Sequence, residues 1–161
     1  MIEKFDNFLP KKIFDPIQIT MLGPGFPWFY NNGINHKDDN LFQFVHVFYS
    51  LPEKIISPYH EEMKSVYNAL GIKNLIRAKA NLNVRTDIHQ NTGFHNDFDK
   101  SWNCKTAILY INTNNGWTEF RKGDRVDCKE NRILIFDSNL EHTAVTCTDE
   151  NVRVVVNLNY E

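Results

Sequence analysis

Short stretches rich in apolar and β-branched residues, bounded by polar turns, recur in the second half of the chain, a pattern typical of β-strands. Strands are therefore expected at residues 75–84, 104–112, 117–121, 133–136, 143–148 and 152–160. Polar turns such as Thr113-Asn114-Asn115-Gly116 separate them. Many short antiparallel strands joined by polar turns predict a mostly β protein built as a jelly roll, also called a double-stranded β-helix.

The first half of the chain is expected to flank this core with two further strands. Residues 13–22 read as an opening strand, which ends where Gly23 and Pro24 break regular structure. Residues 41–49 alternate as a second strand. One face of that strand carries Phe42, Phe44, His46 and Phe48.

A helix is expected to begin at Ser57-Pro58. Serine is a good N-cap, and proline suits the first helical position. Apolar residues then follow at the spacing of one buried helix face, and Gly71 is a natural C-terminal stop. The residues of that face are Met63, Val66, Tyr67 and Leu70. We expect this flanking helix to cover an outer face of the larger sheet.

Length and composition set the broad class of the protein. The chain has 161 residues, which fits one domain with its core at residues 75–160 and supporting elements at residues 1–74. The net charge is −2 and basic residues are scattered, so we expect no nucleic-acid surface. There is no signal-peptide core and no run of about 18 apolar residues that would span a membrane. The three cysteines form no CxxC pair, which is typical of a reduced protein of the cytoplasm.

Two histidines and one aspartate form a candidate metal site. His95 and Asp97 are two residues apart, and alternate residues of a strand point the same way. His142 begins another predicted strand and would complete the set. Two histidines and one carboxylate are the ligands of mononuclear non-haem Fe(II) oxygenases, where open coordination positions serve catalysis. Zinc also accepts these ligands and stays an alternative. Apolar walls are expected from Phe94, Phe98 and Trp102.

Arg153 is a lone cation in a strand of valines. Burying its charge without an anion is costly, so a buried Arg153 implies an anionic ligand. Its planar fork suits a carboxylate. The alternative is an arginine at a sheet edge that pairs with a surface carboxylate. Beside the metal ligands, Arg153 favours iron over zinc and indicates 2-oxoglutarate, a five-carbon dicarboxylate, as a co-substrate.

A simple hairpin would place Arg153 at a suitable distance from the metal. If residues 147–152 form the turn between the last two strands, His142 lies across from about Leu158. Arg153 would then lie roughly 16 Å back along its strand at about 3.3 Å per residue, a gap that its side chain shortens to on the order of 10 Å. That span fits the length of a dicarboxylate that reaches the metal with its other end.

Residues 75–160 resemble the Fe(II)- and 2-oxoglutarate-dependent dioxygenases, most closely the prolyl 4-hydroxylase-like group. Beside the H-x-D motif, residues 105–112 are similar to the family's Thr-rich strand that ends in Tyr-Leu-Asn. Residues 115–120 are similar to its Gly-Gly-x-Thr-x-Phe motif, and residues 132–138 lead to His142 as in the family. The compact length and the aromatic residues 26–30 are also similar to small oxygenases encoded by bacteriophages.

The resemblance implies an enzyme that uses Fe(II), 2-oxoglutarate and O2, with ascorbate as an auxiliary reductant. In that enzyme Arg153 would bind the C5 carboxylate of 2-oxoglutarate, and Tyr110 is expected to be a hydroxyl partner of the same carboxylate. Asn81 and Asn83, on the strand before the loop, are expected to hydrogen-bond the co-substrate. The residues implied as iron ligands are His95, Asp97 and His142.

The chain also departs from the group. Prolyl hydroxylases usually carry lysine at the position of Arg153. A tyrosine is common in that group just before the H-x-D motif, where this chain has Gly93-Phe94. Alkylation-repair demethylases carry an arginine where this chain has Asn159, which argues against that branch.

Three functions therefore stay open. The first is hydroxylation of a protein or peptide side chain, such as proline. The second is the same chemistry on a small molecule or nucleobase. The third is a jelly-roll binding or structural protein without turnover, which an intact ligand set disfavours.

Overall fold

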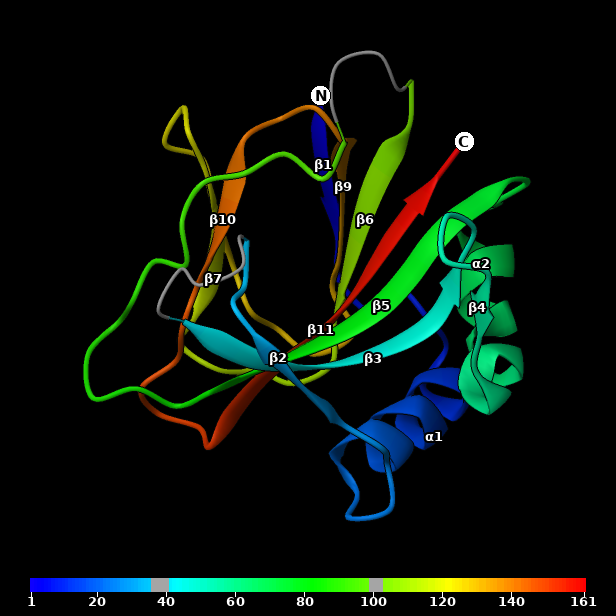
Figure 1. Ribbon diagram of the computed structural model, residues 1–161, viewed down its shortest axis with the longest axis horizontal. Helices are drawn as coiled ribbons and strands as arrows, with labels where there is room; N and C mark the ends of the chain where they lie inside the picture. The colour runs from blue at the N-terminus through cyan, green and yellow to red at the C-terminus, as the bar shows by residue number, and fades with distance from the viewer. Residues whose placement is uncertain (36–40, 99–102) are drawn as a thin grey trace.

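The computed structural model describes residues 1–35, 41–98 and 103–161, and these residues form two antiparallel β-sheets that face each other (Figure 1). The major sheet has the strand order β1 (Ile2–Phe5), β9 (Ile133–Asp137), β6 (Lys105–Tyr110), β11 (Val152–Tyr160), β5 (Leu75–Val84), β3 (Phe42–Ser50) and β2 (Phe29–Asn32), with β4 (Ile55–Ile56) paired to β3. The minor sheet has the order β10 (His142–Val145), β7 (Trp117–Phe120) and β8 (Arg125–Asp127). This architecture confirms the predicted double-stranded β-helix.

The long strand β5 shows why the major sheet has two different faces. Its successive side chains point to opposite sides, as in any strand. Ala78 and Ala80 are fully buried and belong to the apolar cluster that includes helix residues. Arg77 and Lys79 point the other way and line a cavity. The alternation of β5 therefore separates a packing face from a polar face that is available for chemistry.

An α-helix, α1 (Lys11–Leu22), occupies the segment for which a strand was predicted at residues 13–22, so that prediction was wrong. The buried residues of α1 are Phe14, Ile17 and Met21, which have helical spacing and pack in the cluster under the major sheet. The β-branched residues of this segment suggested a strand, and Pro16 lies inside the helix. Burial of one helical face outweighs these unfavourable local propensities, because packing supplies most of a helix's stability in proteins.

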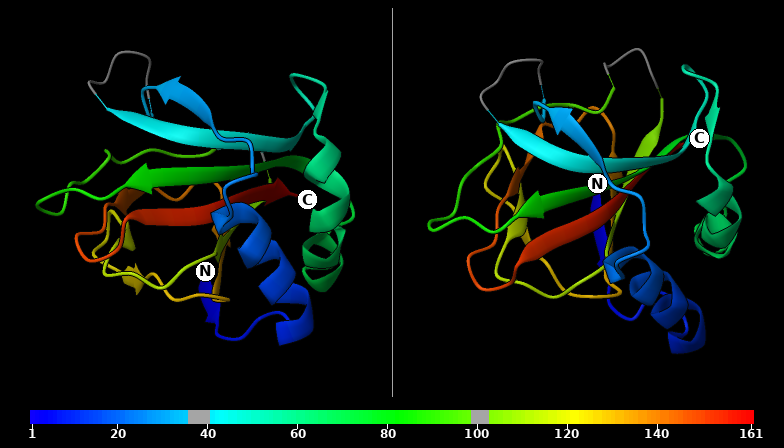
Figure 2. Two further views of the ribbon diagram at one scale, coloured as in Figure 1. Left: turned by 90° about the horizontal axis from the view of Figure 1, so that it is seen from below. Right: turned by 60° about the horizontal axis from the view of Figure 1, so that its bottom comes forward.

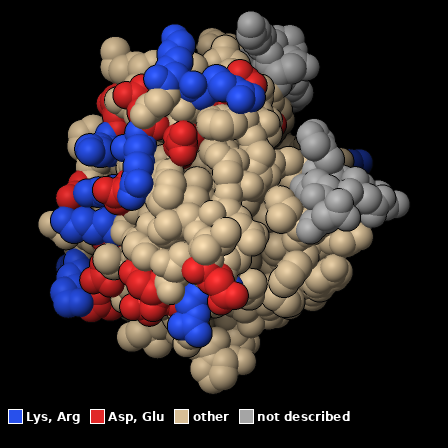
Figure 3. Space-filling view, turned by 90° about the vertical axis from the view of Figure 1, so that its left-hand side faces the viewer, with Lys and Arg blue, Asp and Glu red and all other residues tan. Residues whose placement is uncertain are grey.

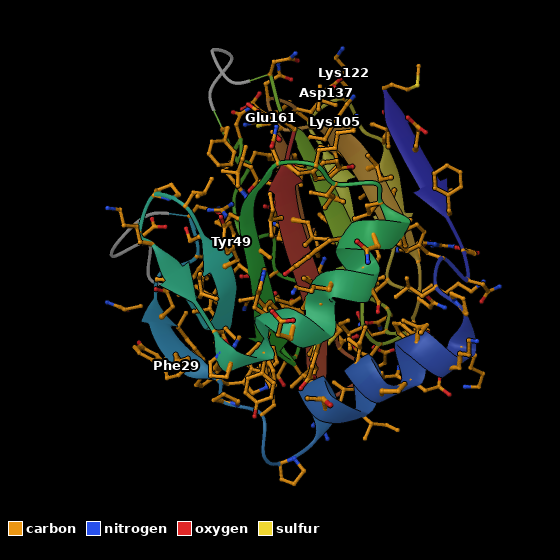
Figure 4. All side chains as sticks on the ribbon, turned by 90° about the vertical axis from the view of Figure 1, so that its right-hand side faces the viewer. Phe29, Tyr49, Lys105, Lys122, Asp137 and Glu161 are labelled. Carbon is orange, nitrogen blue, oxygen red and sulfur yellow. The ribbon has the colours of Figure 1, made fainter. Side chains whose placement is uncertain are left out.

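The helix predicted after Ser57 is present as a 3-10 turn, η1 (Pro58–Met63), that continues into α2 (Lys64–Ala69). Ser57 Oγ accepts a hydrogen bond from the backbone N–H of Tyr59 (3.1 Å), which confirms the predicted N-cap. Gly71 follows with a φ of +66°, as a helix stop requires. Seen from the helix side, α1 and α2 lie in front of the major sheet, with Phe29 at its lower left (Figure 4).

Two apolar clusters hold the fold together. The larger lies between the helices and the outer face of the major sheet. The smaller lies between the two sheets, over β6, β9, β7 and β8, and contains Phe120, Phe136 and Tyr110. It fills only part of the space between the sheets. The cavity occupies the part beside β5 and β11, which run side by side with β3 in Figure 2.

The predicted hairpin between the last two strands is absent. β10 pairs with β7 in the minor sheet, whereas β11 lies between β5 and β6 in the major sheet. The chain crosses from one sheet to the other at residues 146–151, as a jelly roll requires. All three cysteines are free and buried. Among the described residues, no helix is long and apolar enough to cross a membrane.

Candidate metal centre

A pair of backbone hydrogen bonds brings the predicted metal ligands together. His95 N donates to His142 O (2.9 Å), and His142 N donates to His95 O (3.0 Å), which makes an isolated β-bridge. Asp97 follows two residues after His95. One ligand atom from each of the three side chains lies within 4.8 Å of the other two. The group therefore forms around a single bridge and not on the regular strand that the sequence suggested.

Both histidine rings are oriented by backbone carbonyl groups. His95 Nδ1 is 3.2 Å from Gly93 O, and His142 Nδ1 is 3.0 Å from Leu140 O. A carbonyl oxygen only accepts, so each Nδ1 carries the proton and donates it. Each Nε2 then keeps a free lone pair, which is the form in which histidine binds a metal. This donor set fits Fe(II).

Asp97 is held by three neighbours that the sequence analysis did not identify. Its Oδ2 accepts hydrogen bonds from Thr106 Oγ1 (2.7 Å) and Asn159 Nδ2 (3.1 Å). Its Oδ1 accepts from Arg77 Nη2 (3.2 Å), and its side chain is only 4% exposed. Their positions on inward faces of β6, β11 and β5 were the available signal. Such contacts fix the direction of a ligand carboxylate and tune its basicity.

The site favours the protonation states that a metal requires. Burial lowers the pKa of His95, and His142 lowers it further, which keeps its imidazole neutral. Burial acts to raise the pKa of Asp97, but His142, Arg77 and Thr106 together hold it below its ordinary value. A neutral histidine and an ionised aspartate bind divalent metals without first losing a proton.

Gly93 allows a close approach between Asn35, in the segment after β2, and the loop that carries His95. Its φ is +94°, and an added Cβ would lie 2.9 Å from Asn35 Nδ2. Asn35 donates to the carbonyls of Thr92 (2.5 Å) and Gly93 (2.8 Å), so it anchors the loop just before the metal ligand. This contact explains why glycine occupies the position.

Arg153 is buried without a carboxylate partner. Its residue exposure is 2%, and no carboxylate of residues 1–35, 41–98 or 103–161 lies within 4.0 Å of its guanidinium group. Its contacts are Cys128 Sγ (3.2 Å), Thr118 Oγ1 (3.2 Å) and Trp117 O (3.5 Å). Burial raises the pKa of Cys128, which keeps that thiol neutral. The charge of Arg153 is therefore uncompensated, and an anionic ligand would compensate it.

Gly116 makes room for the Arg153 side chain. A Cβ at this position would lie 3.1 Å from Arg153 Cδ and 2.7 Å from Val145 O. Any larger residue would therefore clash with the Val145 backbone and crowd the arginine side chain. This contact gives a physical reason for a glycine in the segment that resembles the Gly-Gly-x-Thr-x-Phe motif.

Arg153 reaches the metal ligands across the two sheets and not along a hairpin. Its guanidinium group contacts Thr118 on β7, which pairs with Ala144. His142 pairs with Phe120, two residues further along the same ladder. Two residues of strand correspond to about 7 Å. The distance between Arg153 and the metal ligands therefore suits a dicarboxylate. The predicted hairpin at residues 147–152, from which that distance was first estimated, does not form.

The remaining predicted co-substrate contacts lie close to Arg153. Tyr110 is fully buried and donates to Thr118 Oγ1 (2.7 Å), the hydroxyl that Arg153 also contacts, but it does not line the cavity. Asn83 pairs with Arg153 across the β5–β11 ladder, and Asn81 pairs with Val155. Both asparagines line the cavity. Their roles stay predictions.

All these groups face one cavity of about 630 Å³, a volume within the usual range for small-molecule sites. Phe94 and Phe98 contribute to its walls as expected, whereas Trp102 lies outside the described residues. Lys79 also lines it, and the sequence analysis did not identify this residue. The alternation of Arg77, Lys79, Asn81 and Asn83 on one strand face could have revealed it.

Comparison with known proteins gives matches to structures only. No protein-family model and no curated protein matches the chain. Among solved structures, a prolyl hydroxylase of Trichoplax adhaerens, in complex with a hypoxia inducible factor oxygen degradation domain peptide fragment, matches with a TM-score of 0.65 and 12% identity over 99% of this chain and 83% of that chain. A prolyl-4-hydroxylase of Pseudomonas putida matches with a TM-score of 0.62 and 11% identity over 99% of this chain and 92% of that chain.

A non-heme α-ketoglutarate-dependent epimerase from nogalamycin biosynthesis matches with a TM-score of 0.65 and 11% identity, over 99% of this chain and 78% of that chain. At such low identities the likeness establishes the fold. The chain therefore has the fold of the Fe(II)- and 2-oxoglutarate-dependent oxygenases, as the resemblance implied, and it carries the grouped His-Asp-His set.

Proposed function

We propose that the protein is an Fe(II)- and 2-oxoglutarate-dependent oxygenase. The observation that carries the proposal is the pairing of two features in one cavity. One is a His-Asp-His set with both Nε2 atoms free, and the other is a buried arginine without a carboxylate partner. A jelly-roll binding protein would need neither feature.

Each residue has a distinct part in the proposed reaction. His95, Asp97 and His142 hold the metal, and Thr106 and Asn159 keep the aspartate turned toward it. Bound Fe(II), with 2-oxoglutarate and O2, supplies oxidative decarboxylation of the co-substrate coupled to oxidation of a substrate C–H bond. Three protein ligands leave coordination positions open for these partners.

Arg153 orients the co-substrate in this proposal. Its guanidinium group binds the C5 carboxylate, with Thr118 beside it and Tyr110 behind Thr118. Asn83 and Asn81 lie along the path from Arg153 toward the metal ligands and hydrogen-bond the co-substrate. Ile108 and Val155 give the cavity floor an apolar stretch that excludes water from the reacting atoms.

Hydroxylation is the proposed outcome, with a protein or peptide side chain as the first candidate substrate. The likeness to two prolyl hydroxylases supports this candidate. A small-molecule substrate is the second candidate. It is supported by the likeness to an epimerase of nogalamycin biosynthesis and by the polar and charged side chains among the residues that line the cavity.

The test is release of succinate from 2-oxoglutarate. Purified protein with Fe(II), O2 and ascorbate should convert 2-oxoglutarate to succinate slowly even without a prime substrate. His95→Ala should abolish this turnover, because it removes a metal ligand. Lys122→Ala, an exposed lysine on the turn after β7, serves as the matched control and should retain it. Wild-type protein that holds zinc tightly and has no affinity for 2-oxoglutarate would contradict the proposal.

A further inference from the structure

Lys79 is a cation on the cavity floor that the proposed chemistry does not use. It lies on β5, two residues from Arg77 and on the same face. No carboxylate of the described residues lies within 4.0 Å of its ammonium group, and it donates no hydrogen bond to them. Burial, followed by the charge of Arg77, lowers the pKa of Lys79 to about 8. Lys79 is thus a partly desolvated cation without a hydrogen-bond or carboxylate partner among the described residues.

The surroundings of Lys79 contain further unsatisfied polar atoms. Asn157 lies opposite Lys79 across the β5–β11 ladder, and Asn81 is the next inward residue of β5. The Oδ1 atoms of both asparagines are buried without a hydrogen-bond partner among the described residues. Buried polar groups normally find partners, so two unsatisfied amide oxygens beside a partly buried ammonium group indicate a ligand-binding surface.

The position of Lys79 separates it from the co-substrate anchor. Arg153 lies opposite Asn83, four residues along β5 from Lys79, which corresponds to about 13 Å of strand. Arg77, on the other side of Lys79, contacts the metal ligand Asp97. Lys79 therefore lies beside the metal end of the cavity, where the oxidised group of a substrate must come.

The charged side chains of the described residues leave one cavity cation for a substrate. Among these residues, three cations line the cavity (Arg77, Lys79 and Arg153), and two carboxylates do so (Asp97 and Glu141). Glu141 pairs with Arg121, which does not line the cavity, and Arg77 pairs with Asp97. Arg153 is the proposed anchor of 2-oxoglutarate, which leaves Lys79 as the cavity cation without a carboxylate partner in this part of the chain.

We propose that Lys79 binds a carboxylate of the substrate close to the carbon that is oxidised, an inference that rests on the proposed oxygenase function. One unpaired ammonium matches one singly charged group, whereas a phosphate dianion would call for a second unpaired cation. Asn157 accepts a hydrogen bond from an adjacent N–H or O–H of the same substrate. The carboxylate belongs either to a small acid or to an aspartate or glutamate side chain of a peptide.

The test measures how close small probes come to the metal. The full-length protein is loaded with Mn(II), whose unpaired electrons relax the NMR signals of nearby ligands, and is saturated with 2-oxoglutarate. The probes are free aspartate and glutamate, the peptides Ala-Asp-Ala and Ala-Glu-Ala with both ends blocked, and the matching asparagine and glutamine compounds. Relaxation of the free acids but not of the peptides would identify a small acid as the source of the carboxylate, and the reverse would identify a peptide.

With wild-type protein, we expect the Mn(II)-induced increase in NMR relaxation rate to be at least fivefold larger for one acidic probe than for its neutral amide counterpart. Lys79→Met should remove that difference, Lys79→Arg should retain most of it, and Lys105→Met should retain it fully. Lys105 pairs with Asp137 outside the cavity and is a matched control (Figure 4). Equal relaxation of acids and amides, no relaxation of any acid, or an unchanged difference in Lys79→Met would each overturn the proposal.

Titration of 2-oxoglutarate into the same Mn(II)-loaded proteins separates this inference from the proposed function. If wild-type protein binds no 2-oxoglutarate, the oxygenase function itself fails. Alternatively, wild-type protein binds 2-oxoglutarate, and Lys79→Met weakens the binding of 2-oxoglutarate more than the binding of the acidic probe. In that case Lys79 belongs to the co-substrate site, and the proposal that it binds a substrate carboxylate is overturned.

Discussion

The chemistry of this protein depends on a few residues whose charges the fold leaves without partners. Arg153 and Lys79 are cations of this kind, and they face the same cavity as the two histidine Nε2 atoms. Each lies on an inward face of the major sheet, where an apolar residue would pack at no electrostatic cost. Retaining these cations is therefore best explained by anionic ligands.

Replacement of Arg153 separates binding from stability. Arg153→Met removes charge-assisted hydrogen bonds to the co-substrate, each worth about 1.5–3 kcal/mol, so the Kd of 2-oxoglutarate should rise 10- to 100-fold. Without ligands, the same change removes a buried uncompensated charge, and the free energy of unfolding should increase by about 1 kcal/mol. Calorimetric titration and urea denaturation of the ligand-free protein measure the two effects. A large loss of stability with unchanged affinity would show that Arg153 is a structural residue.

Gly116 provides an independent test of the same anchor. In Gly116→Ala the new Cβ would lie 2.7 Å from Val145 O and 3.1 Å from Arg153 Cδ, so the backbone must shift and the arginine is crowded. We expect the Kd of 2-oxoglutarate to rise by about tenfold, since loss of one hydrogen bond to a charged group costs about 1.5 kcal/mol. Gly25→Ala is the control, because no atom lies within 4 Å of the added Cβ. Equal affinities of both variants would be evidence against this contact.

The residues nearest the metal were easier to anticipate than their supports. The H-x-D motif and His142 could be identified from residue type and order alone. Thr106, Arg77 and Asn159 hold Asp97 by contacts between three strands that are far apart in sequence. Such contacts depend on the order of the strands in the sheet, and this order cannot be inferred from the spacing of residues along the chain.

At the scale of elements, the strands of the second half formed where short apolar stretches between polar turns predicted them, whereas two interpretations failed for physical reasons. Residues 13–22 form α1 because Phe14, Ile17 and Met21 share one helical face, which packing selects over the β-branched character of the segment. The expected final hairpin is absent because β10 and β11 pair in different sheets. A local turn preference cannot reveal that crossing.

His46 connects three elements on the outer side of the major sheet. Its Nδ1 lies 2.9 Å from Pro27 O, before β2, and its Nε2 lies 2.7 Å from Ser57 Oγ, the N-cap of η1. Its ring also contacts Phe26 and Tyr59. A neutral ring satisfies both polar contacts, since Nδ1 donates to the carbonyl and Nε2 accepts from the hydroxyl.

This arrangement predicts a pH dependence of stability. Burial lowers the pKa of His46, against the opposing effect of the Pro27 carbonyl, so the unfolded chain binds this proton at a higher pH than the folded protein does. The contribution of the neutral His46 ring to the free energy of unfolding is therefore fully present above the pKa of histidine in the unfolded chain, about 6.5. It is lost as the pH falls below that value. Urea denaturation between pH 8 and pH 5 should show a smaller loss of stability in His46→Phe than in wild type. Identical pH profiles would contradict this account.

At the scale of the molecule, packing and the candidate binding cavity occupy different regions of the fold. The helices cover the outer face of the major sheet, and one end of the space between the sheets is filled by apolar side chains. The other end is the cavity. On the face shown in Figure 3, basic and acidic side chains lie interspersed along one edge, and much of the remaining surface is uncharged. Among the described residues, the cavity contains two cations, Arg153 and Lys79, that have no carboxylate partner within 4.0 Å.

Because the cavity lies between the sheets, its ligands should stabilise the whole fold. In the proposed function, metal and 2-oxoglutarate bind the folded protein only, so each would add stability according to its concentration relative to its Kd. At 100 times the Kd, 2-oxoglutarate should add about 2.7 kcal/mol to the free energy of unfolding of the Mn(II)-loaded protein. Thermal denaturation with and without the co-substrate measures this shift. His95→Ala should lose the dependence on both ligands.

Calorimetric titration of 2-oxoglutarate into the metal-loaded protein without oxygen tests the central claim most directly. The account predicts one equivalent of binding that requires both a metal at His95, Asp97 and His142 and the guanidinium group of Arg153. Binding should therefore disappear in the metal-free protein and weaken by 10- to 100-fold in Arg153→Met, the loss expected for one charge-assisted hydrogen bond or more. The absence of any binding to wild-type protein loaded with Fe(II) or Mn(II), or binding that is equally tight in Arg153→Met, would contradict it.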